Sequence, residues 1–256
     1  MGIGKTKRQR KHDLRLLVIR LATSASLGIL IVACFHAYSY LTTTDKLAIS
    51  DIEIAGLTRL DASEVASVLD GLRGQNILLV GLEDYRSRFA KHPRIRYAEM
   101  RKVLPNKVIC NVTEREPVAL IYTNRFLEVD GDGMVMNADG LTAKLDLPII
   151  SGLGADVVKE GSLCQDARLG GVLDVLELCK RYGGRFAENV SELRVGNRGI
   201  SIVSLEEGVV LLLGQSKFED RLRRYFMMQN TIARSDDDAR LIDLRFEDQI
   251  VLRSGI

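Results

Sequence analysis

Residues 102–120 read KVLPNKVICNVTEREPVAL, two stretches of alternating apolar and polar residues around a Pro-Asn turn. Alternation with a period of two is typical of strands that bury one face, so it predicts strands over 95–103 and 108–112, joined as a hairpin. The second stretch runs into Glu-Arg-Glu-Pro at 114–117. Because proline cannot donate a hydrogen bond to a β ladder, the hairpin is expected to end or change its partner at Pro117.

The residues before this hairpin predict one strand and two helices. Residues 47–54 alternate in polarity and predict a strand that ends at Gly56. Residues 61–64, Asp-Ala-Ser-Glu, have the spacing of a helix capping box. A second helix is expected over about 82–91, because Pro93 follows it. The resulting order, β-α-α-β-β, predicts one domain over residues 47–116.

A basic head and an uncharged apolar segment precede this domain. Residues 1–20 hold seven of the chain's 36 Lys and Arg residues and one of its 34 Asp and Glu residues. Residues 21–44 carry no charged side chain, and roughly 20 apolar helical residues suffice to cross a bilayer. By the positive-inside rule, the head lies in the cytoplasm and residues 45–256 lie across the membrane. We therefore expect a single-pass type II inner-membrane protein with a periplasmic body, and not a nucleic-acid-binding one.

Two processing signals compete with a permanent anchor. Residues 31–34, Ile-Val-Ala-Cys, resemble a lipoprotein cleavage box with Cys34 as the lipidated residue, and a secretory signal peptide is cut after a small residue. Apolar residues continue past Cys34 to Leu41, whereas a lipoprotein box is usually followed by a polar linker. The sequence therefore favours an uncleaved anchor, with Tyr38 and Tyr40 at the outer membrane interface.

Beyond Pro117 the chain is rich in predicted strands and has two predicted helices. Apolar residues at helical spacing predict a helix over 169–179, and residues 216–219 form a second capping box with an apolar helix face behind it. The whole chain is predicted to be α+β: a transmembrane helix, the β-α-α-β-β domain, and a mixed β-rich domain over 117–256. The strands expected in this last domain are 119–122, 126–129, 134–136, 147–152, 190–195, 200–205, 209–213, 241–246 and 250–253, with a turn at 206–208.

Residues that would support catalysis or metal binding are scarce. Outside the head and the apolar segment the only histidine is His92, and no G-x-S-x-G, zinc-ligand spacing or phosphate loop accompanies it. One acidic stretch suggests calcium but lacks the third acid and the final Glu of an EF-hand, so a hairpin turn is expected there. Its residues are Asp130, Asp132, Asn137 and Asp139. We expect no catalytic residue, no metal, no cofactor and no small-molecule substrate.

Two further sets of residues are interpreted as structural. Cys110 and Cys179 fall on the apolar side of a predicted strand and a predicted helix, where cysteine acts as a small hydrophobe, and no disulfide framework is implied. A basic run near the hairpin lacks interleaved aromatic residues for base stacking, so one solvated sheet face explains it, with a partner or an anionic lipid surface as the alternative. The run comprises Lys91, Arg94, Arg96, Arg101, Lys102 and Lys107.

Short motifs run through the chain in a defined order. In the first domain they are Ile52-x-Ile54-x-Gly56-Leu57, Gly74-Gln75-Asn76-Ile77-Leu78, Pro93-x-Ile95-x-x-Ala98, Leu104-Pro105-Asn106-x-Val108 and Glu114-Arg115-x-Pro117-Val118-Ala119. In the second they are Leu127-x-Val129-Asp130-x-Asp132-Gly133, Leu147-Pro148-x-Ile150-x-Gly152 and Asp243-Leu244-Arg245-Phe246. Each is weak alone, but with the N-terminal anchor they cover nearly the whole chain. The chain resembles bacterial division proteins of the FtsQ/DivIB family, in which a POTRA domain precedes a β domain.

The resemblance implies a scaffold and not an enzyme. Proteins of this family are single-pass inner-membrane members of the division machinery, so we expect this chain at the division septum. The implied partners are FtsB- and FtsL-like coiled-coil proteins, with FtsK-type and septal peptidoglycan synthase-type proteins as further ones. The implied mode of binding is β-augmentation, in which a partner segment adds to an exposed sheet edge.

The resemblance also implies which residues bind partners. The last hairpin supplies the sheet edge, Arg245 and Phe246 match the family's Arg-aromatic pair, and Arg198 falls where the family places a basic contact for a partner carboxylate. The chain has no tryptophan, so Ile250 or Leu252 is expected to replace the usual aromatic anchor. The POTRA residues implied as contacts for upstream division proteins are Ile52, Ile54, Gly56 and Arg59.

The sequence departs from the family's pattern at the last hairpin. The final strand is short, so the edge offered to a partner is small. Phe246 stands where tyrosine is common, which removes a hydroxyl, and ordinary core packing is the alternative role for this side chain. A POTRA-type export chaperone is the alternative function, but such proteins usually carry tandem POTRA copies before a membrane barrel.

Overall fold

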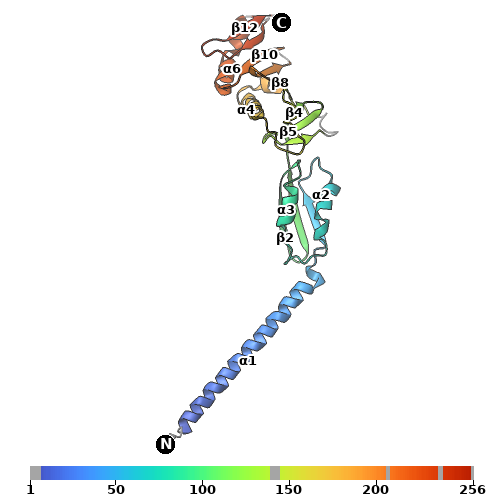
Figure 1. Cartoon of the computed structure of the whole chain (residues 1–256), viewed down its shortest axis with the longest axis vertical. Coiled ribbons are helices and arrows are strands. Elements are labelled where there is room, and N and C mark those ends of the chain that lie inside the picture. The colour runs from blue at the N-terminus through green and yellow to red at the C-terminus, as the bar shows by residue number, and fades with distance from the viewer. Residues whose placement is uncertain (1–6, 139–144, 206–207, 236–238, 255–256) are drawn as a thin grey trace. The chain divides into compact units, whose positions relative to one another are not determined.

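The structure is a computed structural model, and it describes residues 7–138, 145–205, 208–235 and 239–254. A long N-terminal helix is followed by a β-α-α-β-β arrangement and then by a β-rich region that contains helices (Figure 1). The predicted α+β class is confirmed. Of the turn expected at 206–208, residues 206 and 207 lie outside the described residues, and so does the acidic residue Asp139.

Helix α1 (Lys7–Thr43) contains the segment predicted to cross a membrane. From Leu17 to Thr43 it is apolar over 27 residues, and its side chains are not buried by the rest of the chain. At about 1.5 Å per residue this length exceeds the ~30 Å of a bilayer's hydrocarbon core. The N-terminal apolar helix therefore fits a single-pass membrane protein.

The β-α-α-β-β arrangement builds a three-stranded sheet in the order β1-β3-β2, with β1 parallel to β3. Its hairpin strands lie where the alternating pattern predicted them. The first strand starts later than expected, because Asp45–Leu47 form a 3-10 turn and Ala48 makes only an isolated bridge to Asn76. The elements are β1 (Asp51–Ala55), α2 (Ala62–Leu69), α3 (Glu83–Phe89), β2 (Ile95–Val103) and β3 (Lys107–Glu114).

The β-rich region forms one mixed sheet of nine strands in the order β12-β11-β10-β9-β8-β7-β4-β5-β6. Three neighbouring pairs are parallel, namely β10–β11, β4–β7 and β7–β8. The strand expected over 241–246 ends at Asp243. The strands are β4 (Pro117–Tyr122), β5 (Phe126–Asp130), β6 (Val135–Asn137), β7 (Ile149–Ser151), β8 (Val190–Gly196), β9 (Gly199–Ser204), β10 (Val210–Gly214), β11 (Ala239–Asp243) and β12 (Val251–Ser254).

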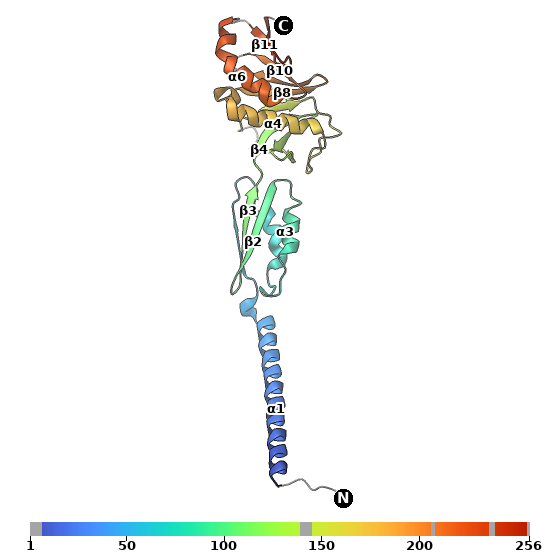
Figure 2. The same ribbon diagram turned by 90° about the vertical axis from the view of Figure 1, so that its left-hand side faces the viewer.

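Helices α4 (Ala167–Tyr182) and α6 (Phe218–Ser235) pack on each other and on this sheet (Figure 2). Helix α4 contacts β8 and α6 contacts β10, so both bury their apolar faces against alternate residues of those strands. The apolar face predicted for α6 is confirmed by the burial of Leu222, Tyr225 and Ile232. A short helix between them, α5 (Arg185–Glu188), was not predicted.

Two cysteines serve as core residues, as the sequence indicated. Burial raises the pKa of Cys110 to about 11 and that of Cys179 to about 12. Both thiols are therefore protonated and unreactive at neutral pH. Together with Cys34 and Cys164 they are free, so the described part of the chain contains no disulfide.

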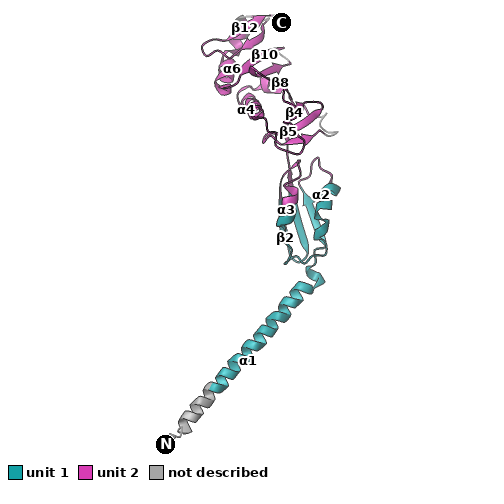
Figure 3. Ribbon diagram, viewed as in Figure 1, with its two compact units in different colours: residues 1–55, 62–86, 99–111 teal, residues 56–61, 87–98, 112–256 magenta. Residues whose placement is uncertain are grey.

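The chain divides into two compact units whose limits differ from a simple cut at Pro117 (Figure 3). The first unit comprises residues 1–55, 62–86 and 99–111. The second comprises 56–61, 87–98 and 112–256, so two loop-containing segments group with the β-rich region. The domain limits proposed from the sequence stay a prediction.

Glu114, the last residue of β3, explains why the hairpin ends on charged residues. Its carboxylate accepts hydrogen bonds from the backbone amides of Thr58 (2.7 Å), Arg59 (3.0 Å) and Leu60 (3.1 Å), and from the Thr58 hydroxyl (3.0 Å). These amides lie in a loop without ladder partners, and unsatisfied backbone donors are costly. The carboxylate therefore satisfies the donors of this loop, and the next strand starts at Pro117 in the nine-stranded sheet.

Carboxylates of β5 and the turn after it bind three arginines of the second unit. Glu128 is 0% exposed, and its two carboxylate oxygens accept from Arg59 (2.6 Å) and Arg94 (2.9 Å). Arg115 donates to Asp130 (2.6 Å) and to Asp132 (3.1 Å). Since a buried charge needs a partner, these pairs tie segments 56–61 and 87–98 to β5.

The interpretation of the basic run as one solvated face is wrong for Arg94. Arg94 belongs to the buried pair with Glu128, and only 13% of its side chain is exposed. Arg96 lies 3.3 Å from a carboxylate oxygen of Asp132. Lys107 bridges Asp51 and Glu53 on the neighbouring strand. Arg96 nevertheless keeps 57% of its side chain exposed, and Lys91, Arg101 and Lys102 are exposed as well.

We predict that Glu114→Gln destabilises the protein at neutral pH by about 1–2 kcal/mol, because hydrogen bonds to a charged acceptor contribute more than neutral ones. Burial alone raises the pKa of Glu114, but the amides of Thr58, Leu60 and Arg59 outweigh it and lower the pKa below its usual 4.5. A carboxylate with a lowered pKa stabilises the fold above its unfolded pKa, and this stability disappears as pH falls through the folded pKa. In chemical denaturation, the difference from wild type should be constant above about pH 5 and shrink at lower pH.

The matched control is Glu116→Gln, which removes the same charge two residues away. Glu116 is exposed and makes no hydrogen bond or ion pair with the described residues. Its substitution should change the free energy of unfolding by less than about 0.5 kcal/mol at every pH. Equal effects of the two substitutions would contradict the assigned role of Glu114.

Candidate partner-binding surfaces

The nine-stranded sheet has two edge strands, β6 and β12. The chain itself covers the β6 edge, since the Val135 amide donates to Ser162 (3.0 Å) and the Gly161 amide donates to Val135 (2.9 Å). Strand β12 pairs with β11, with Leu252 opposite Ile242, and no described strand lies beyond it. The edge that another strand can extend is therefore β12.

An arginine of α6 holds the loop between β11 and β12. Arg224 donates to the backbone carbonyls of Leu244 (3.1 Å) and Phe246 (2.7 Å), and also to that of Glu247. Because these carbonyls accept hydrogen bonds from Arg224, they do not pair with a neighbouring strand. This explains why β11 ends at Asp243 and not at the predicted residue 246. The Phe246 side chain is 45% exposed, so core packing, its alternative role, is excluded.

Arg245 is held by a carboxylate two residues before it. Its guanidinium binds Asp243 through two hydrogen bonds, Nε to Oδ1 (2.8 Å) and Nη2 to Oδ2 (2.6 Å). The Arg245 side chain keeps 30% of its surface exposed, whereas that of Asp243 keeps 2%. The Arg245 guanidinium lowers the pKa of Asp243 below its usual value. Arg245 is therefore held in a fixed orientation beside the exposed Phe246, with its charge balanced by Asp243.

The predicted anchors Ile250 and Leu252 lie next to this loop but are only partly accessible. Ile250 precedes β12 and Leu252 lies within it, and both pack in part against the core of the second unit. These two residues therefore contribute to core packing. Among the three apolar residues predicted to bind partners here, Phe246 has the exposed side chain.

Arg198 lies in the turn between β8 and β9, and the structure brings this turn close to Arg245. A Cβ at Gly199 would lie 2.0 Å from the carbonyl of Gly214, and a Cβ at Gly214 would lie 3.2 Å from Cγ of Arg245. Both glycines have positive φ, so larger residues are excluded there. Arg198 is exposed and has no ion-pair partner among the residues that the structure describes. The two predicted cations therefore lie at the same end of the sheet.

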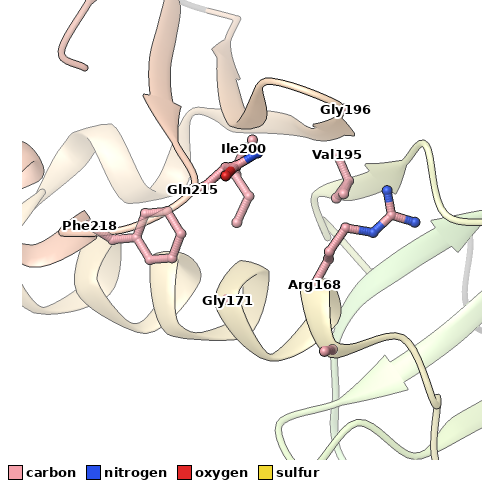
Figure 4. Close-up of a pocket in the computed structure, with 9 residues that line it drawn as sticks. Arg168, Gly171, Val195, Gly196, Ile200, Gln215 and Phe218 are labelled. Carbon is pink, nitrogen blue, oxygen red and sulfur yellow. The ribbon is translucent and has the colours of Figure 1, made fainter. Parts of the chain in front are cut away.

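A cavity of about 330 Å³ opens beside the same turn (Figure 4). Phe218, Ile200 and Val195 give it apolar walls, and Gly171 of α4 leaves room for Phe218. Arg168 reaches its rim but is already paired with Asp166 (2.6 Å). The cavity therefore has the shape and chemistry to hold an apolar side chain.

The four residues predicted on the POTRA face separate into two kinds. Ile52 and Ile54 are half-buried on β1, an edge strand of the three-stranded sheet in the first unit. In the second unit, a Cβ at Gly56 would lie 2.1 Å from the Val112 carbonyl oxygen, and the Arg59 side chain is 14% exposed in its pair with Glu128. Gly56 and Arg59 therefore serve the fold, whereas Ile52 and Ile54 lie on the less exposed face of β1 and keep part of their surface accessible.

The described residues contain no cluster of three or more metal-ligating side chains. The His92 ring accepts a hydrogen bond from the Arg94 amide (3.3 Å) in the turn before β2, which is a structural contact.

Known protein families match both regions in chain order. Residues 47–115 match the POTRA domain of FtsQ type, and residues 119–245 match the C-terminal domain of the cell division protein FtsQ/DivIB. A cell division protein FtsQ of Syntrophotalea carbinolica is 31% identical over 205 residues, which cover 78% of this chain and 71% of that protein. The chain belongs to the FtsQ/DivIB family.

Other FtsQ proteins extend the match to almost the full chain. That of Geobacter sp. (strain M21) is 24% identical over 86% of this chain and 80% of its own length. That of Myxococcus fulvus is 24% identical over 95% of this chain and 91% of its own length. The FtsQ family is one of non-catalytic division scaffolds that work with other division proteins, so membership supports a role in the division machinery and not the alternative of an export chaperone.

Sequence reasoning missed the residues that position this family member's candidate surface. Asp243 was noted only as part of a motif, although an acid two residues before an arginine on a strand end is a recognisable signal for a local pair. Arg221 and Arg224 carry no such signal, because their acceptors are backbone carbonyls, several of them more than 20 residues later in the chain. The sequence predicted only that Arg221 and Arg224 lie on the polar side of an amphipathic helix.

We predict that Arg224→Ala frees the β11–β12 loop of this FtsQ/DivIB family member. The carbonyls of Leu244 and Phe246 lose a charged donor, so the free energy of unfolding should fall by about 1.5–3 kcal/mol. Hydrogen–deuterium exchange of residues 245–250 should accelerate. Arg223→Ala is the control, because Arg223 is exposed and makes no described contact. Equal exchange in both variants would contradict the assigned role of Arg224.

Proposed function

We propose that this protein is a non-enzymatic, bitopic scaffold of the bacterial division machinery that binds segments of FtsB- and FtsL-like coiled-coil proteins by β-augmentation at β12. The observation that carries the proposal is the contrast between the two sheet edges: β6 is covered by the chain's own backbone, and β12 is the terminal strand. An added strand gains main-chain hydrogen bonds along β12, and alternate side chains provide specificity.

The edge is short, so side chains must supply part of the affinity. Strand β12 spans four residues, Val251–Ser254. Phe246 offers an exposed aromatic surface next to it, and aromatic residues are frequent interface hot spots. Ile250 and Leu252 line the same edge. Arg245 and Arg198, at one end of the sheet, are suited to carboxylates of the partner segment.

The three-stranded sheet offers a second edge for other division proteins. Ile52 and Ile54 on β1 supply partly exposed apolar side chains, flanked by the charged cross-strand group of Lys107 with Asp51 and Glu53. We assign this edge to upstream partners of FtsK type. Septal peptidoglycan synthase-type proteins are reached through the coiled-coil pair.

This role requires a type II topology, in which the N-terminus of the protein is cytoplasmic and its body lies beyond the inner membrane. Residues 1–20 hold seven cations and one acid before the apolar helix, which favours a cytoplasmic N-terminus and a periplasmic body. In that orientation β12 faces the compartment in which the periplasmic segments of coiled-coil partners lie, and the protein acts at the division septum.

Substitutions at the edge test the binding mode. Leu252→Lys and Phe246→Asp should each weaken capture of a purified FtsB–FtsL pair by the detergent-solubilised full chain at least about tenfold, or about 1.4 kcal/mol. Leu163→Lys is the control, because Leu163 is 54% exposed and lies beside the opposite, β6 edge. Undiminished capture by folded Leu252→Lys and Phe246→Asp would remove the proposed interface.

Depletion tests the cellular role. A fluorescent fusion of the chain should localise at midcell, and its depletion should give filamentous cells because septation stops. Normal division after depletion would refute the scaffold. Midcell localisation of the Leu252→Lys variant without rescue of division would separate recruitment of the protein from its binding of later partners.

A further inference from the structure

Two consecutive exposed leucines lie beside the end of the apolar helix. Leu78 is 46% exposed and Leu79 is 59% exposed, although both belong to a folded loop of the first unit. Their neighbours Ile77 and Val80 are buried, so the loop is well packed and turns these two side chains outward. Single exposed leucines are common on proteins, but an adjacent pair in an ordered loop suggests a surface that meets an apolar medium.

Asn76 ties this loop to α1. Its Nδ2 atom donates to the backbone carbonyls of Leu41 (2.8 Å) and Thr42 (3.1 Å), in the last turn of the helix. The last carbonyls of a helix have no partners within it, so Asn76 acts as a cap supplied from a distant segment. The Ile77 amide also donates to the Leu47 carbonyl (2.8 Å), just after the helix. The loop is therefore held at the helix end through side-chain and backbone hydrogen bonds.

Chain geometry keeps the leucines close to the end of the apolar helix. Leu78 and Leu79 follow Asn76 in a single turn, in which the Leu79 amide donates to the Asn76 carbonyl (3.1 Å), and the first and fourth Cα atoms of such a turn lie less than about 7 Å apart, so both leucines stay close to the residue that caps α1. The apolar run of α1 continues to the last turn of the helix, which therefore lies near the hydrocarbon boundary. The headgroup region extends about 5–7 Å beyond that boundary on each side.

We propose that Leu78 and Leu79 insert into the bilayer interface on the side of residues 45–256, as a second membrane contact beside α1. The two side chains contact the region between the lipid headgroups and the acyl chains, where apolar side chains are favoured. Exposed charges near the loop are of both signs, Lys46 and Arg73 with Asp45 and Asp70, so the contact rests on apolar insertion and does not require anionic lipid. This contact is independent of partner binding at β12.

The absence of tryptophan from the chain gives a direct test. The full-length Leu79→Trp variant contains a single tryptophan, and it is reconstituted in phosphatidylcholine nanodiscs with lipids brominated near the glycerol end of the acyl chains. We expect emission at shorter wavelength than in a solvent-exposed control, and loss of most of the intensity when the brominated lipid is present. Leu78→Trp provides a second probe of the same surface.

The control is Leu163→Trp, which replaces an equally exposed leucine in the second unit. Its emission should stay at long wavelength and should not be quenched by the brominated lipid. If Leu78→Trp and Leu79→Trp both behave like this control, the membrane contact is overturned. Quenching that requires phosphatidylglycerol in the nanodisc would overturn the apolar basis of the contact. Neither outcome bears on partner capture, which the edge variants test separately.

Discussion

The second unit depends on a carboxylate with no access to solvent. Glu128 lies on β5 between Leu127 and Val129, which point into the apolar core, so alternation directs its side chain to the opposite face. There Arg59 and Arg94 neutralise it through separate oxygens. Removal of one partner from a buried ion pair costs about 3–5 kcal/mol, because it leaves an uncompensated charge. The loops that supply these arginines must therefore fold together with β5, and this explains why residues 56–61 and 87–98 belong to the same compact unit as the nine-stranded sheet.

Helix α6 links that sheet to the candidate partner-binding edge. Its apolar face, with Leu222 and Tyr225, packs into the core, and the crossover it makes sets β11 parallel to β10. From its polar side, Arg221 and Arg224 bind the backbone that follows β11. Helix α6 therefore stabilises the sheet and also holds the loop beside β12. This loop carries Arg245, which is partly exposed, and Phe246, which is exposed. Because the loop carbonyls are bound by arginines, the backbone groups presented along this sheet edge are those of β12.

The elements with strong local periodicity could be predicted from the sequence. The apolar segment of α1, the hairpin β2–β3, and the buried faces of α4 and α6 all follow from spacing between near neighbours in the chain, as does the place of Cys110 and Cys179 in the core. Proline at 117 correctly marked the change of sheet. The family could be recognised for a related reason, because its motifs consist of strand and turn residues at defined spacing.

The pairing of charges and the exposure of single residues depend on tertiary structure. Arg59 and Glu128 are 69 positions apart, so no local pattern distinguishes Arg59 from a solvated surface cation, and the same holds for Arg94. The sequence left core packing as an alternative for Phe246, and only the folded structure shows that 45% of this residue is exposed. Hydrophobic periodicity and secondary-structure propensity are properties of residues close in the chain, so the sequence alone predicts them. Which carboxylate lies opposite which guanidinium, and which sheet edge remains open, follow from contacts that exist only after distant segments have packed.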